Sequence, residues 1–346
     1  AEGQAFAALK FMEAAEAEAS HVLLKLGSID VAPESYVSVK PEKLFGRHCA
    51  ILGATGGGKS WTTARIIEEC LRYKTKIILL DATGEYRGFD GEHVANFHLG
   101  APVNTAKSSA PCTLPQTSFI ESDFIALFEP AGKVQGPKLR AAIRSLRLAA
   151  LAPHVATGGI IKKIDQSKVP IMTEEAKAGI AEKLDDPQQA FDVWKLVSQI
   201  EQECVYPDGF GSARGQKDFT KWGGDSGEVS FCLSLMSRIN GILSSSSFEC
   251  VFKSKAPALT EKISSFVSNE DRLLRICLSG VAFEFKAREI VANVIGRHLL
   301  NMARNGAFKS RPVVVIVDEA HNFLGRQIGA DDAVARLDAF ELIAKE

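Results

Sequence analysis

The residues that could do chemistry begin with the stretch Gly53–Ser60, which fits the pattern G-x-x-x-x-G-K-[ST] at every required position. Its successive glycines allow a tight turn whose backbone N–H groups point inward and can bind phosphate oxygens. Lys59 would reach the β- and γ-phosphates of a nucleotide, and the Ser60 hydroxyl would hold a magnesium ion. The residues expected to bind the nucleotide are Gly53, Thr55, Gly56, Gly57, Gly58, Lys59, Ser60 and Trp61.

A second chemical signal lies near the C-terminus, where the apolar run 313–317 is followed by Asp318 and Glu319. Consecutive β-branched residues predict a strand that is buried on both faces. Asp318 would join the magnesium shell through water, and Glu319 would polarise the attacking water. The two motifs in this order predict a site that hydrolyses ATP with Mg²⁺ as the cofactor.

A sheet and a helix must position these residues. The apolar run 48–52 predicts a buried strand that leads into the glycine-rich loop, and residues 61–73 have apolar side chains at helical spacing. Another apolar run, 75–80, ends in Asp81. Because an open parallel sheet binds ligands at the carboxyl ends of its strands, Asp81 is either an active-site carboxylate or a residue that caps the following turn.

The whole chain predicts an α/β fold, with a mostly parallel sheet flanked by helices. We expect an N-terminal module at 1–42 (helix 4–20 and two strand-like segments), a core formed by 43–155 and 245–346, and a helical insertion at 156–244. One helix of the core carries a basic row off its apolar stripe, which is either a DNA-facing row or, more simply, a solvated face. The row consists of Lys138, Arg140, Arg144 and Arg147.

Composition limits the class of protein. With 346 residues, 41 basic and 42 acidic, the formal net charge is −1, which excludes a generally basic nucleic-acid-coating protein but not a local basic channel. No apolar run approaches the length of a membrane span, and no signal-peptide pattern is present. The seven cysteines are scattered without a C-x-x-C pair, so free thiols and a cytoplasmic location are expected.

The motifs together resemble the HerA-type ATPases of the FtsK/HerA superfamily. The resemblance rests on 47–60, the turn 80–86 and the segment 317–324, and it extends through 283–290, 296–300 and 340–346. It implies a RecA-like core, a homo-hexameric ring and movement of duplex DNA through the pore. It also implies that Arg47 interacts with the nucleotide phosphates and that Asp81 is an active-site carboxylate.

The same resemblance implies partners and shows two departures. Family partners are nucleases or, in antiviral (phage-defence) operons, effectors such as sirtuin-like NADases. The family begins with a complete small β-barrel, of which 21–39 would be only part. Its pattern also continues beyond Glu346 with an arginine supplied to a neighbouring subunit, a sensor residue and a further core strand. We therefore expect the chain to stop short of the natural one and the middle of the sheet to lack a strand.

Three functions compete. The first is an ATP-driven DNA translocase or helicase, and the second is a related motor that moves protein, as in secretion and conjugation. The third is a ring-shaped assembly hub that licenses a partner effector. Residues 318–321 also spell the letters of a DEAH-box RNA helicase, but that family places its two motifs closer together and adds a second RecA domain.

Overall fold

The computed structural model describes residues 22–209, 217–323, 326–328 and 335–345. The helix predicted at 4–20 lies outside the described residues. Among the described helices, none is long and apolar enough to cross a membrane.

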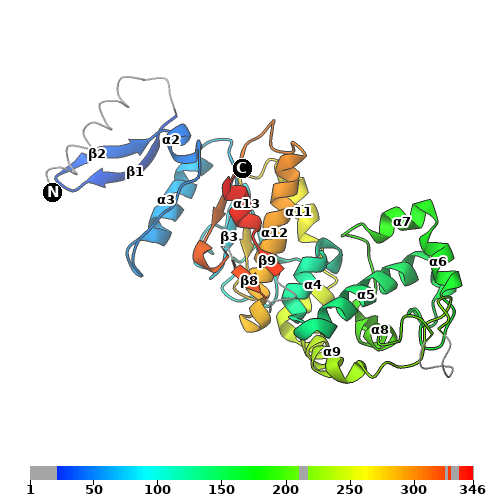
Figure 1. The fold of residues 1–346 in the computed structure, drawn as a ribbon. Helices are drawn as coiled ribbons and strands as arrows, with labels where there is room; N and C mark the ends of the chain where they lie inside the picture. The colour runs from blue at the N-terminus through cyan, green and yellow to red at the C-terminus, as the bar shows by residue number, and fades with distance from the viewer. Residues whose placement is uncertain (1–21, 210–216, 324–325, 329–334, 346) are drawn as a thin grey trace.

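A five-stranded parallel sheet forms the centre of the fold, in the order β5-β4-β6-β3-β7 (Figure 1). The strands are β3 (Lys76–Asp81), β4 (Val94–His98), β5 (Ala110–Pro111), β6 (Leu273–Cys277) and β7 (Val313–Val317). Both β3 and β6 are fully buried, as continuous apolar runs in a parallel sheet require. The predicted α/β class is confirmed.

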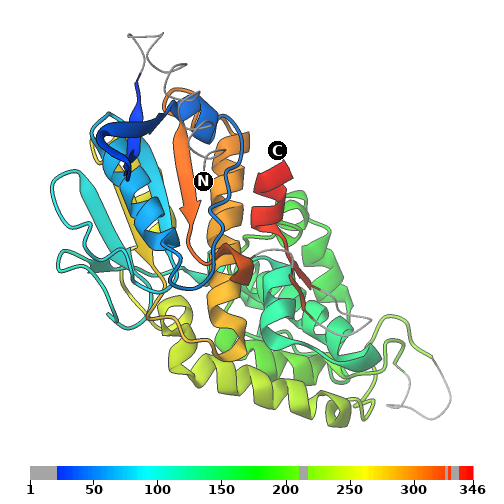
Figure 2. The same ribbon diagram turned by 90° about the vertical axis from the view of Figure 1, so that its left-hand side faces the viewer.

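Alternate residues of β3 face two different layers. Ile77 and Leu79 pack with Ile67 of α3 (Lys59–Leu71), whereas Ile78 and Leu80 belong to the cluster that contains α12 (Ala287–Arg304). Figure 2 shows α3 on one side of the strands and α12 on the other. This alternation follows from the two-residue period of a strand and places the sheet between helices.

Two predictions about burial and strand pairing are wrong. The run 313–317 is half-buried rather than buried on both faces, because β7 lies at the sheet edge and pairs only with β3 among the described strands. The run 48–52 forms no strand, and Leu52 is 89% exposed. A strand needs a neighbour for its backbone N–H and C=O groups, and residues 48–52 have no ladder partner among the described residues.

Most of the described helices lie in the part of the chain between β5 and β6 (Figure 1). In the expected helical insertion, residues 169–184 form two helices, because the backbone of Lys177 is extended between them. The helices of this part are α4 (Glu121–Phe128), α5 (Gly132–Leu151), α6 (Val169–Glu175), α7 (Ala178–Leu184), α8 (Leu196–Glu203), α9 (Val229–Ser244), α10 (Glu249–Phe252) and α11 (Leu259–Ser268).

Short helices and hairpins complete the described chain. The 3₁₀ turns are Gln116–Ser118, Pro153–Val155, Val193–Lys195, Ser246–Phe248, Glu284–Lys286 and Ala320–Asn322. The remaining elements are α2 (Pro41–Phe45), α13 (Ala339–Lys345) and two antiparallel hairpins, formed by β1 (Leu24–Ile29) with β2 (Ala32–Val39) and by β8 (Arg326–Ile328) with β9 (Ala335–Leu337). One buried cluster contains both Ile200 of α8 and Ile295 of α12, and the domain boundaries at 156 and 244 stay a prediction.

The N-terminal hairpin is attached to α3 by a buried carboxylate. Glu69 accepts the backbone N–H of Lys25 at 2.9 Å and pairs with Arg65 at 2.8 Å and Arg72 at 3.1 Å. Leu24 packs in the same cluster as Ile67. The hairpin is thereby tied to the helix that begins at the glycine-rich loop.

Candidate active site

The glycine-rich loop has the backbone of a phosphate cradle. Gly56 and Gly58 have φ of 76° and 84°, values that side-chain-bearing residues rarely adopt. At Gly57, a Cβ atom would lie 2.9 Å from the Ala54 carbonyl oxygen, which accepts the Gly57 N–H at 2.9 Å. All three glycines are therefore required by the loop, and the first turn of α3 starts directly after Gly58.

Lys59 and Ser60 occupy that first turn. The Lys59 amino group donates to the carbonyls of Gly53 and Ala54, each at 3.1 Å, so the charge is held over the loop. The unpaired N–H groups and partial positive charge of a helix N-terminus favour an anion at this point. The loop and its lysine thus fit nucleotide phosphates.

Asp318 lies at the end of β7, beside the end of β3. Its backbone N–H donates to the Leu80 carbonyl at 3.0 Å, and its Oδ2 accepts a long hydrogen bond from Thr83 at 3.4 Å. Burial, helped by the negative charges of Asp81, Glu85 and Glu319, raises the pKa of Asp318 to about 6. A carboxylate in such surroundings favours a nearby cation.

Glu319 follows in a strained backbone conformation. Its φ is 50° and its ψ 41°, in the left-handed region. Its carboxylate lies 3.1 Å from Nδ1 of His321. Strain of this kind at a non-glycine residue is frequent at functional sites, and here it turns the chain sharply where β7 ends.

Asp81 is completely buried and engaged by the protein itself. Its Oδ2 accepts a hydrogen bond of 2.7 Å from Nε of Arg275 and lies 2.7 Å from Nη2 of the same guanidinium, and both side chains have 0% exposure. Its carboxylate also accepts the N–H groups of Gly84 at 2.7 Å and Tyr86 at 3.1 Å. These contacts favour the turn-capping alternative, in which Asp81 fixes the turn that carries Thr83 and Glu85.

Arg275 is a residue that the sequence reasoning missed. It lies in the middle of β6, directly opposite Leu79 of β3 in the parallel register. The signal was present as a lone charge in the apolar run 273–278, a position that requires a buried partner. The partner could not be identified, because it lies almost two hundred residues earlier in the chain.

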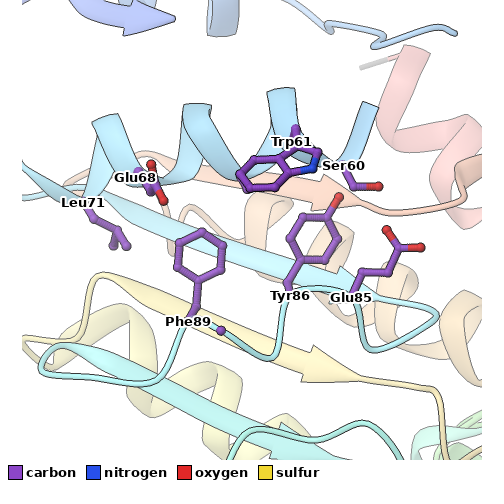
Figure 3. Close-up of a pocket in the computed structure, with 9 residues that line it drawn as sticks. Ser60, Trp61, Glu68, Leu71, Glu85, Tyr86 and Phe89 are labelled. Atoms are coloured by element: carbon purple, nitrogen blue, oxygen red, sulfur yellow. The ribbon is translucent and has the colours of Figure 1, made fainter. Parts of the chain in front are cut away.

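A cavity of about 670 Å³ opens beside Ser60, between α3 and the turn after β3 (Figure 3). Trp61, Tyr86 and Phe89 line it, and Trp61 is 82% exposed. Figure 3 shows the Glu85 carboxylate on the same side as the Ser60 hydroxyl. Glu85 is thus a second residue near the site to which sequence reasoning assigned no role.

Arg47 stands apart from these contacts. It is exposed and makes no hydrogen bond or ion pair with the described residues. The structure brings Asp81 and Asp318 together at the ends of β3 and β7. It leaves Arg47 exposed, in the segment that precedes the glycine-rich loop.

A magnesium site would be shared with the nucleotide. Within the described residues, no group of three or more His, Cys, Asp or Glu side chains could hold a metal ion by itself. Mg²⁺ commonly binds through one or two protein oxygens together with phosphate oxygens and water. Ser60 and Asp318 fit this arrangement, since one is a hydroxyl at the phosphate cradle and the other a carboxylate whose raised pKa a cation would lower.

Comparison with known proteins agrees with this geometry. The family model described as "Helicase HerA, central domain" matches residues 24–197, just over half of the chain, including the glycine-rich loop and Asp81. A probable helicase of Methanocaldococcus jannaschii is 38% identical over 64 residues, which is 18% of this chain and 12% of that protein. This chain belongs to the family of the HerA helicase central domain.

Proposed function

We propose that the protein is an ATP-hydrolysing motor that moves or unwinds duplex DNA. The observation that carries the proposal is the glycine cradle, in which Lys59 and Ser60 begin α3. The carboxylates Asp318 and Glu319, which directly follow β7, complement this cradle in the proposed site. Membership of the HerA family supports the motor class.

In this mechanism, the loop amides and Lys59 hold the β- and γ-phosphates. Bound Mg²⁺, held by Ser60 and Asp318, would neutralise charge on the phosphates. Glu319 would orient and polarise the attacking water as a general base. Asp81 does not touch the substrate in this proposal: with Arg275, it fixes the turn that places Thr83 next to Asp318.

The assembly and its partners are proposed from the family resemblance alone. The protein would work in the cytoplasm as a homo-hexamer with duplex DNA in its pore, and Arg47 would bear on the nucleotide phosphates. It would serve a partner nuclease or a sirtuin-like NADase effector in antiviral defence or in the processing of DNA ends.

ATP turnover with and without duplex DNA tests the proposal. DNA should stimulate turnover, and Lys59→Ala should reduce it at least about a hundredfold, as loss of a transition-state donor does. Lys74→Ala is the matched control, because it removes the same charge from an exposed position just beyond the other end of α3. Near-normal turnover of Lys59→Ala would refute an ATPase motor, and native mass spectrometry would show whether a hexamer forms.

A further inference from the structure

A second cavity, of about 310 Å³, lies far from the phosphate loop, where α5 meets the start of α4 and the end of α7. Arg140, Arg144 and Arg147 line it together with Glu121 and Asp185. The spacing of the arginines places them on one face of α5. Lys138 is not part of this group, since it pairs with Glu228 at 2.7 Å. Figure 1 shows α5 and α7 on the opposite side of the sheet from α3.

The carboxylates around the cavity leave many arginine donors unused. Arg140 donates only its Nε, to Glu121 at 2.9 Å. Arg144 donates Nε to Glu175 at 3.3 Å and Nη1 to Asp185 at 2.9 Å. Each guanidinium carries five N–H donors in a planar fork, so both nitrogens of the Arg140 fork and Nη2 of Arg144 have no bond to the described residues.

Arg147 adds a buried charge to this wall. Its side chain is 6% exposed, and its Nη atoms reach only the backbone carbonyls of Leu184 and Pro187. Its Nε is buried and has no hydrogen-bond partner among the described residues. A buried guanidinium with an unused donor and no carboxylate bonded to it is costly unless an anion approaches.

We propose that this arginine cavity, defined by Arg140, Arg144 and Arg147, binds a phosphoryl anion. Three guanidiniums meet the carboxylates Glu121, Glu175 and Asp185, so the charges balance, but the arginines keep N–H donors that these carboxylates do not use. The planar forks that carry these donors match tetrahedral phosphate oxygens. Asp185 is 80% exposed and can swing away from Arg144 when an anion enters. The phosphoryl group can come from a small phosphorylated ligand or from a nucleic-acid strand. The site does not depend on the ATPase proposal.

Pyrophosphate binding, measured by titration calorimetry, tests the site. The protein carries Lys59→Ala, so that the phosphate loop does not bind the probe. Adding Arg144→Gln should weaken binding about tenfold, the effect of one charge-assisted bond. Adding Asp185→Asn should tighten it severalfold, because a competing carboxylate is removed. Arg311→Gln is the matched control, since Arg311 has a similar exposure and a surface carboxylate partner, and it should change nothing.

Asp185→Asn separates binding from a structural role. If the arginines only fasten α7 to α5, this variant lowers the melting temperature and leaves pyrophosphate binding unchanged, and the proposal is overturned. Because Asp185 is a surface residue, Asp185→Asn also tests the proposal if Arg144→Gln does not fold. Repeating the titrations with a short DNA duplex distinguishes the sources. A tenfold loss for DNA assigns the site to strand phosphates, and a loss confined to pyrophosphate assigns it to a small phosphorylated ligand.

Discussion

The two halves of the proposed site are built in opposite ways. The phosphate loop is exposed and held by local contacts: Lys59 bonds carbonyls five and six residues before it. The carboxylate half rests on a buried ion pair and is held by distant contacts: Arg275 and Asp81 are 194 residues apart, and Thr83 and Asp318 are 235 apart. The first half depends on backbone conformation, and the second depends on the correct order of strands.

This difference separates chemistry from stability. A change in the phosphate loop should remove activity and leave the fold intact, because few buried groups lose partners. A change beneath the carboxylates should unfold the sheet, because a buried charge is left without its partner.

The largest effect on stability is expected for Arg275→Met. It leaves Asp81 charged and buried without its ion pair, which should lower the free energy of unfolding by about 3–5 kcal/mol. Urea denaturation measures the loss. Arg311→Met is the control, and it should cost less than about 1 kcal/mol because its ion pair is at the surface. A similarly small loss for Arg275→Met would mean that the buried pair does not support the strand ends.

Glu319→Gln should reduce ATP turnover by about 10²–10⁴-fold, the usual contribution of a general base, while nucleotide binding and stability are retained. Turnover and nucleotide affinity are measured side by side. Glu261→Gln removes an equal charge from an exposed position on α11 and should leave both unchanged. Loss of binding together with turnover would show that Glu319 supports the cradle and is not the base.

Asp318→Asn should stabilise the protein at pH 8. The pKa of Asp318 is raised from 3.8 to about 6, so the folded state favours the protonated form, and ionisation costs stability as the pH rises through 6. Removing the charge should gain about 2 kcal/mol at pH 8 and roughly half as much at pH 5. Thermal unfolding across this range measures the difference. A variant less stable than the parent at pH 8 would contradict the burial of an uncompensated carboxylate.

The smallest effect is expected for Trp61→Ala. Because this side chain is 82% exposed, its removal should change the free energy of unfolding by less than about 0.5 kcal/mol. Ile67→Ala, on the same helix but fully buried, should cost about 2–5 kcal/mol. Equal losses for the two variants would show that the start of α3 is not independent of the core.

Local sequence determined the parts whose residues contact their own neighbours. The phosphate loop, the helix after it and the strands at 76–81 and 313–317 follow from glycine conformation and apolar periodicity. These signals are readable because each depends on residues only a few positions apart.

Tertiary structure decided which distant groups meet. It paired Asp81 with Arg275, set the raised pKa of Asp318, left 48–52 without a strand and exposed β7 at the sheet edge. It also turned three arginines of α5 toward a cavity, where sequence favoured a solvated face. The reason is physical: burial and charge pairing depend on neighbours that other strands and helices supply. The residues next to a group in the sequence do not determine which distant residues will become those neighbours.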